Sequence, residues 1–362
     1  MMINRLALQR RFHVPDAILM HKSLSEVIGQ IIYRMEYFQN NIITLVGPTQ
    51  VGKTTAMKLV EDTYSAQVES GAMRFIRLNL RAGSGNIDNE RKIIFQKILD
   101  QLAFPGKTYQ GVPNDLIGLT SGRIRRSSLT ELRVAAERAL STGQITVVIA
   151  DEAQELSAGV NSFVPCKGQL SILKDLSIQD NVIVVLVGGY AVMDIYSIDP
   201  HLGGRLSVVG FHPYPSNDDG KREFALSLSK MTETLPVKSN RGSMLDWFNR
   251  LYDFCCGNIG ILQKVVKEII AQAEVSGAEA ITVEHVVSRT EDESSRDALL
   301  EEYAIGLSCF PGVTIFSSEQ ILLAYERRKG NIPEGKGGRK RGGRRGKAKQ
   351  IKVSSDVRGD LG

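Results

Sequence analysis

The chain has 362 residues, 42% of them apolar, so it can bury a core and is too long for one small domain. Its longest apolar run, residues 182–193, is too short to cross a bilayer, and the first residues lack the apolar centre of a signal peptide. The net charge of +5 comes from residues 327–352, which hold twelve Lys or Arg and one Glu, so the chain before them is acidic.

The N-terminal residues predict a helix that packs on the core. Ile18, Ser25, Ile28 and Ile32 recur at helical spacing before the first strand-like run. Cysteine usage points to a reducing compartment, because the four cysteines have neither a CxxC spacing nor a paired histidine. We therefore expect a cytoplasmic protein without a zinc site; its cysteines are Cys166, Cys255, Cys256 and Cys309.

A phosphate-binding loop is predicted directly after the first strand, Asn41–Val46. The pattern Gly47-x4-Gly52-Lys53-Thr54 is a complete Walker A motif, and an amphipathic helical stretch follows it. Backbone N–H groups of such a loop and of the helix N-terminus face phosphates, and glycine lets the backbone curl around them. The bland alternative is a Gly-rich turn with a solvated lysine.

The cofactors expected at this loop are ATP and Mg²⁺. Lys53 would reach the β- and γ-phosphates, and the Thr54 hydroxyl would bind Mg²⁺. The residues expected to contact the nucleotide are Gly47, Pro48, Thr49, Gln50, Val51, Gly52, Lys53, Thr54 and Thr55.

A basic stretch, residues 105–128, is a candidate contact for nucleic acid. Lys and Arg side chains bind phosphates without reading bases. An ordinary solvated loop is the alternative. The residues expected to touch DNA are Lys107, Arg123, Arg125 and Arg126.

The second catalytic signal is an apolar strand, Ile145–Ala150, that ends in two acids. Such a continuous run is typical of a parallel strand buried on both faces. Asp151 suits the Walker B role of holding Mg²⁺ through water, and Glu152 suits the general base for an attacking water. The alternative is that both acids only cap the next helix.

Three more strands are expected at Met73–Leu80, Asn181–Val187 and Val208–His212, alternating with helical segments. Five strands in this order predict an α/β domain with a parallel five-stranded sheet. Arg205 lies in the segment between the last two strands.

The second half predicts a small helical domain. Gly257 is placed to end one of its helices, and a turn before Ile281 leads into a short last helix. The apolar positions at helical spacing are Phe224, Leu228 and Met231, then Leu245, Phe248, Leu251, Tyr252 and Cys255, then Ile261, Leu262, Val265 and Ile269.

The order of these features along the chain resembles that of the AAA+ ATPases. It runs from Walker A to Walker B with Asp-Glu, then to a strand with a terminal polar group, and then to an arginine before the last strand. The resemblance implies that Arg205 reaches, in trans, the γ-phosphate held by a neighbouring subunit. It also implies a helical lid after the core and an N-terminal segment near adenine. Two departures stand out: Gly188-Gly189 occupy the sensor position, leaving Tyr190 or a backbone group, and Lys264 is the nearest cation to the lid's glycine turn, where an arginine is usual.

The lid is similar to that of the TniB/TnsC transposition ATPases. The matching stretches are Leu235-Pro236-Val237, Ser243-Met244-Leu245, Gly257-Asn258-Ile259-Gly260 and Gly277-Ala278-Glu279-Ala280-Ile281-Thr282. The resemblance, over about residues 10–290, implies a ring or filament on duplex DNA that links a target-selector protein (TniQ/TnsD type) to the transposase. Hydrolysis would dismantle the assembly.

Two other functions stay open. An AAA+ loader or signalling switch unrelated to transposition would use the same catalytic residues. A helicase of the DEAQ type matches Asp151-Glu152-Ala153-Gln154 but needs two ATPase cores. The predicted organisation is an N-terminal segment (1–40), ATPase core (41–215), lid (216–290), helical extension (291–326) and disordered basic tail (327–362) that binds DNA or a partner.

Overall fold

The computed structural model describes residues 19–37, 42–80, 87–103, 127–141, 143–156, 163–195, 205–233, 238–239, 247–291 and 293–310. The predicted five-stranded parallel sheet is confirmed, with the order β2-β3-β4-β1-β5. The strands are β1 (Ile42–Val46), β2 (Met73–Asn79), β3 (Ile145–Asp151), β4 (Val182–Gly188) and β5 (Leu206–Gly210).

The last strand begins two residues earlier than the sequence predicts. Its pairing with β1 runs from Leu206 opposite Ile42 to Gly210 opposite Val46. Phe211 still donates its N–H to the Val46 carbonyl, at 2.7 Å, but the chain then leaves the sheet. The apolar run therefore extends past the strand, because Phe211 packs in the core below the phosphate loop.

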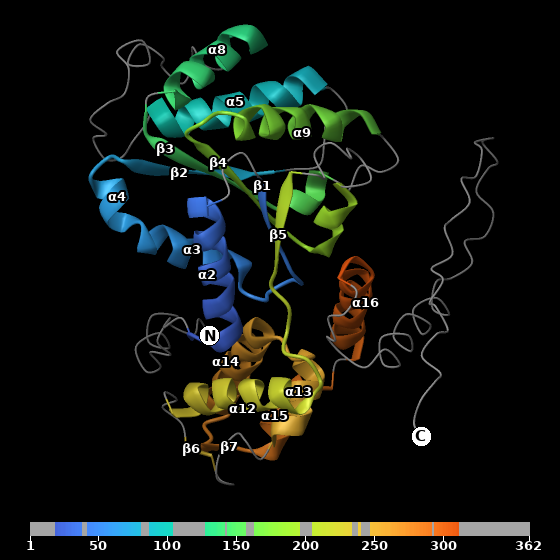
Figure 1. The fold of residues 1–362 in the computed structure, drawn as a ribbon. Coiled ribbons are helices and arrows are strands. Elements are labelled where there is room, and N and C mark those ends of the chain that lie inside the picture. Colours follow the sequence, from blue (N-terminus) through green and yellow to red (C-terminus); the bar gives the residue numbers. More distant parts are fainter. Residues whose placement is uncertain are drawn as a thin grey trace, which may run out of the picture.

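Helices cover both faces of the sheet (Figure 1). One face carries α5 (Ile87–Ala103), α8 (Leu129–Leu140) and α9 (Phe163–Ser177). The other carries α2 (Lys22–Tyr37) and α3 (Lys53–Thr63), with α4 (Ser65–Glu69) beside β2. Among the described helices, none has the length and apolarity that a membrane crossing requires.

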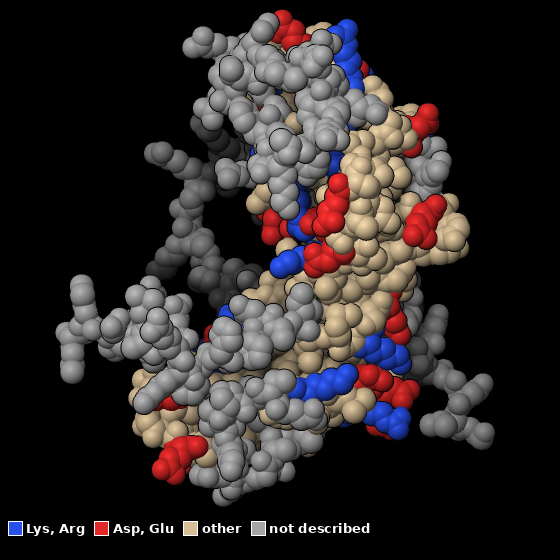
Figure 2. Space-filling view, turned by 90° about the vertical axis from the view of Figure 1, so that its left-hand side faces the viewer, with Lys and Arg blue, Asp and Glu red and all other residues tan. Residues whose placement is uncertain are grey.

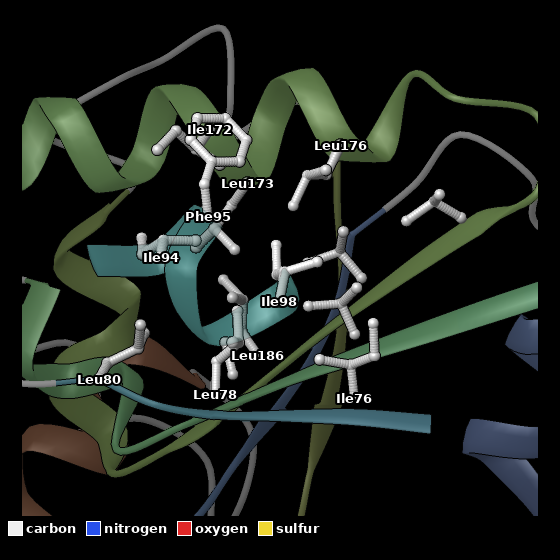
Figure 3. Packing of buried hydrophobic residues seen from close by; sticks show 14 of the residues in the cluster. Ile76, Leu78, Leu80, Ile94, Phe95, Ile98, Ile172, Leu173, Leu176 and Leu186 are labelled. Atoms are coloured by element: carbon white, nitrogen blue, oxygen red, sulfur yellow. The ribbon is translucent and has the colours of Figure 1, made fainter. Parts of the chain in front are cut away.

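The core between α5, α9 and the sheet is a layer of branched aliphatic side chains (Figure 3). Ile94 and Ile98 of α5 lie between Leu173 of α9 and Leu78 of β2, and all four are at most 3% exposed. Full burial of each such side chain contributes about 1.5–3 kcal/mol, so this layer fixes the sheet on which the site is built.

The predicted N-terminal helix is present as α2, but its predicted buried face is wrong. Leu24, Val27, Ile31 and Met35 are buried, whereas Ser25 is exposed and the two predicted isoleucines of the helix are only partly buried. The observed buried positions therefore lie one residue before the predicted ones. They include Leu24 and Met35, so the buried side of the helix extends over nearly its whole length. Ile18 lies outside the described residues.

A smaller helical unit follows the sheet, at the bottom of Figure 1. It contains α12 (Asp218–Glu233), α13 (Phe248–Cys255), α14 (Ile259–Val275), α15 (Val283–Arg289) and the short pair β6 (Lys238–Ser239) and β7 (Ala280–Ile281). The predicted apolar positions of this lid are confirmed as buried or partly buried, except Leu245, which lies outside the described residues. Gly257 has φ +73° at the end of α13, as the sequence predicts. Both Cys255 and Cys256 are core residues.

A last helix, α16 (Glu293–Cys309), lies beside the lid and the sheet (Figure 1). Its Leu300 and Tyr303 belong to the lid's apolar cluster, which also takes in Tyr190 from the short 3₁₀ segment η2 (Tyr190–Asp194) after β4. The helix therefore contacts both the lid and the carboxyl edge of the sheet, where the strands end.

Candidate nucleotide site

The predicted site residues meet where the strands end. The phosphate loop follows β1, Asp151 ends β3, and Gly188 ends the intervening strand β4. Open α/β sheets bind ligands at this edge, where the strand order reverses. A cleft of about 500 Å³ lies there, and its lining residues are Thr49, Gln50, Gly52, Lys53, Thr54, Thr55, Asp151, Glu152, Gln154, Gly188, Gly189, Tyr190, Ala191, Gly260, Gln263, Glu302 and Ile305.

The loop turns into α3 through Gly52, which has φ +110°. An L side chain is strained at such a φ, so the glycine lets the helix begin at Lys53 with its first N–H groups at the cleft. Not every predicted loop residue lines the cleft. Val51 is buried in the core, and a Cβ on Gly47 would lie 2.2 Å from the Phe211 carbonyl oxygen, so these two shape the loop.

The Lys53 ammonium is held inside the loop. Its Nζ donates to the carbonyl oxygens of Gly47 at 2.9 Å and Pro48 at 2.8 Å. Burial lowers the pKa of Lys53, while the carboxylates of Glu302, Glu152 and Asp151 oppose that lowering. Two of the three ammonium donors therefore orient the loop, and the side chain must swing to reach a phosphate.

The two predicted acids lie across the cleft from Lys53. Glu152 has φ +58°, a backbone conformation that is uncommon for a residue other than glycine. Its N–H donates to Asp151 Oδ1 at 2.9 Å. Such local strain concentrates at functional sites. Thr54 and Asp151 both line the cleft, and hydroxyl and carboxylate oxygens are the donors that suit Mg²⁺.

Gln154 is a site residue that the sequence analysis missed. Its amide Nε2 donates to Glu152 Oε2, and its Oε1 accepts the Gly189 N–H at 2.9 Å. Gln154 thereby links Glu152, the predicted general base, to Gly189 at the end of β4, which is the predicted sensor position. The stretch Asp151-Glu152-Ala153-Gln154 contains this glutamine directly after the two acids, which is the signal that indicates it.

Tyr190 is one of the two predicted sensor candidates, but its hydroxyl is bonded to a histidine. It is 1% exposed, and its Oη lies 2.8 Å from His212 Nδ1. Burial raises the pKa of Tyr190 and lowers that of His212 to about 4, so both are neutral at pH 7. The other predicted candidate was a backbone group, and the Gly189 N–H, at the end of β4 and beside the cleft, is such a group.

The lid reaches the phosphate loop through Asn258 and Gly260. Asn258 caps α14, accepting the N–H groups of Gly260 and Ile261, and its Nδ2 donates to the Thr49 carbonyl at 3.1 Å. A Cβ on Gly260 would lie 1.7 Å from the Gln50 carbonyl oxygen, so a glycine is required for this close approach. Gln263 lines the cleft, whereas Lys264 lines a neighbouring groove on α14. No signal in the sequence indicated the Asn258 contact.

Arg205 lies at the opposite edge of the sheet. It directly precedes β5, and its carbonyl accepts the N–H of Ile42, the first residue of β1, at 3.0 Å. The phosphate loop follows the other end of β1. The structure therefore does not bring Arg205 to the cleft of its own chain.

The predicted DNA contacts Lys107, Arg123, Arg125 and Arg126 lie outside the described residues, as do residues 1–18 of the N-terminal segment and residues 327–362 of the tail. On the face shown in Figure 2, the described Lys and Arg side chains are interspersed with Asp and Glu. The described part of that face thus carries a mixed charge, and the predicted basic contacts stay predictions.

Comparison with known proteins agrees with the fold. A family model described as "AAA domain" matches residues 35–195. No curated protein matches the chain.

Among solved structures, the chain is similar to the ORC1 protein of Aeropyrum pernix in complex with DNA. The TM-score is 0.50 at 16% identity, covering 88% of this chain and 79% of that one. A Walker-type ATPase of Pyrococcus abyssi, PABY2304, gives 0.50 at 15% identity, covering 82% and 79%. At such identities the likeness concerns the fold. Residues 35–195 are therefore similar to an AAA domain, and the chain has an AAA+ P-loop ATPase fold.

Proposed function

We propose that the chain is an AAA+ ATPase that regulates DNA transposition by assembling on duplex target DNA. The observation that carries the ATPase part is the division of the catalytic groups between the two edges of one sheet. Lys53, Thr54, Asp151 and Glu152 lie at the carboxyl edge, and Arg205 lies at the amino edge. Such a site is complete only where two copies meet.

In the proposed reaction, Lys53 neutralises charge on the β- and γ-phosphates, and Thr54 and Asp151 would hold Mg²⁺, which would supply further positive charge to the phosphates. Glu152 takes the proton of the attacking water, and Gln154 keeps its carboxylate in place. Arg205 of a neighbouring copy stabilises the charge that develops in the transition state. Hydrolysis removes the group that joins two copies, so the assembly comes apart.

The transposition part rests on the lid's resemblance to the TniB/TnsC family. The stretch Gly257–Gly260 of that resemblance is the one that contacts the phosphate loop through Asn258 and Gly260. The proposed partners are duplex DNA, further copies of the chain, a transposase and a target selector of the TniQ/TnsD type, with Lys107, Arg123, Arg125 and Arg126 as proposed DNA contacts.

A loader or a switch is the second candidate, and the similarity in fold to ORC1, which was solved with DNA, is compatible with either candidate. The two candidates share every catalytic residue and differ in their partner. Capture of a purified transposase by the ATP-bound protein supports transposition, whereas capture of a replicative helicase supports a loader.

Electron microscopy of the protein with duplex DNA and a slowly hydrolysed ATP analogue tests the assembly. We expect regular rings or filaments that disappear when the nucleotide is omitted. Isolated monomers on DNA under the same conditions would contradict the proposed assembly.

A further inference from the structure

A carboxylate from α16 lies on the phosphate loop. The Thr49 N–H donates to both Glu302 oxygens, at 2.9 Å each, and Thr49 Oγ1 donates to Oε1 at 3.3 Å. Backbone N–H groups of this loop are the donors that bind phosphate in P-loop proteins. Glu302 therefore occupies one of the loop donors that are available to a bound phosphate.

Glu302 lies at the hydrolytic end of the cleft. A Cβ on Gly189 would lie 3.5 Å from Glu302 Oε1, and the Gly189 N–H is bonded to Gln154, which in turn holds Glu152. The proposed base acts on water next to the terminal phosphate. The donor that Glu302 occupies is thus at the position of the γ-phosphate rather than of the α- or β-phosphate.

The charges around Glu302 make its position sensitive to a nucleotide. Glu302, Asp151 and Glu152 all line the cleft with a single described cation, Lys53. A γ-phosphate at the Thr49 N–H would be in contact with the Glu302 carboxylate, and two like charges repel strongly at such a distance in a partly buried site. ADP ends at its β-phosphate and leaves the Thr49 N–H to Glu302.

The rest of α16 holds this carboxylate in place. The Tyr303 hydroxyl donates to the Cys256 carbonyl at 3.2 Å, which fastens the helix to the lid. Gly306 lies against the Tyr190 ring, and the Phe310 ring is 4.9 Å from that of His212. One helix thus contacts the phosphate loop, the end of β4 and the lid at once.

We propose that Glu302 competes with the terminal phosphate of ATP for the Thr49 N–H, so that ATP displaces α16 from the phosphate loop and ADP does not. The inference rests on the proposed function in one respect, namely that the cleft binds ATP. Through this contact, the nucleotide state controls the position of α16.

Nucleotide selectivity tests the competition. Glu302→Ala removes the competing carboxylate, and Glu302→Gln keeps its shape without its charge. We expect Glu302→Ala to bind a slowly hydrolysed ATP analogue about tenfold more tightly, with ADP affinity changed less than about twofold, and Glu302→Gln to show the same trend. Glu301→Gln, a neighbouring carboxylate of α16 that does not line the cleft, is the matched control and should bind both nucleotides like the wild type.

Hydrogen exchange of the full chain supplies a second measurement. The ATP analogue should speed exchange of the amides of residues 297–309 relative to ADP, and Glu302→Ala should abolish that difference. An unchanged ratio of ATP to ADP affinity in Glu302→Ala, or an equal gain for both nucleotides, would overturn this inference while leaving the proposed function intact. Failure of the wild-type chain to bind either nucleotide would overturn both.

Discussion

The two edges of the central sheet carry different residues of the proposed reaction. The carboxyl edge holds the phosphate loop, both acids and Gln154, all within one cleft. The amino edge holds Arg205, next to the first residue of β1. The five residues of β1 separate these edges. Four steps of about 3.3 Å join its first and last Cα, so the edges are about 13 Å apart, farther than an arginine side chain extends.

If Arg205 takes part in the proposed reaction, one chain contains both halves of the catalytic site but cannot join them by itself. A second copy that presents its amino edge to the first copy's cleft would complete the site. Association and hydrolysis then depend on each other, which is the property on which the proposed assembly and disassembly rest. Each of the following experiments changes one edge and leaves the other intact.

The largest effect is expected from Arg205→Ala, because an arginine supplied in trans contributes about 10³-fold or more to phosphoryl transfer. ATP affinity of the isolated chain should be unchanged, and DNA-stimulated turnover should be lost. Arg138→Ala, an exposed arginine on α8, is the matched control.

A mixture of two inactive variants, one changed at each edge, tests whether the two edges act together. Lys53→Ala retains Arg205, and Arg205→Ala retains the cleft, so mixed interfaces contain one complete site. We expect the mixture to recover turnover that neither variant shows alone. Normal turnover by Arg205→Ala alone would remove Arg205 from the reaction.

Glu152→Gln should slow hydrolysis by about 10²–10³-fold, because the amide cannot accept a proton from water. ATP should still bind, and assemblies on DNA should persist after ATP is added. Single-turnover hydrolysis and electron microscopy measure the two effects. Glu155→Gln, three residues along the chain, should behave like the wild type, and equal slowing in both variants would argue against a specific base.

Lys53→Ala should weaken ATP binding by about 100-fold, since it removes the cation that neutralises the phosphates. Titration with a fluorescent ATP analogue measures the change. Lys58→Ala removes an exposed lysine from the same helix and should bind normally. Retained affinity in Lys53→Ala would mean that phosphates do not occupy this loop.

The smallest expected effect is a pH dependence of the free energy of unfolding, which comes from two buried histidines near the carboxyl edge. Burial lowers the pKa of His21 and His212 to about 4, from 6.5, so the unfolded chain binds more protons between these values. Stability is therefore full above pH 6.5 and falls as the pH drops towards 4, by about 2 kcal/mol per histidine between pH 7 and pH 5.

Urea unfolding at pH 7 and pH 5 measures this loss. His212→Asn retains a partner for the Tyr190 hydroxyl without titrating, so it should reduce the difference between the two pH values. An unchanged difference in that variant would assign the pH dependence to other groups.

Local pattern was a good guide wherever a short stretch of chain decides the structure. The glycine and lysine spacing of the loop, the apolar strand ending in Asp151 and the helical spacing in the lid each predicted what the structure contains. The pattern failed for the buried face of α2, because which stripe of an apolar helix is buried depends on the surface it meets. Arg205 was found from its order in the chain, while its distance from the cleft followed only from the pairing of β5 with β1.

Local residue patterns were enough to predict the phosphate loop, the two acids and the individual strands of the sheet, because each of these depends on residues close together in the chain. The packing of the molecule adds what these patterns do not contain: Asn258 and Glu302 contact Thr49, across 209 and 253 residues, and Arg205 lies at the edge of the sheet opposite the cleft. Such contacts depend on how the lid and α16 pack on the sheet. That packing is a property of many buried side chains together, and the pattern around any one residue does not contain it.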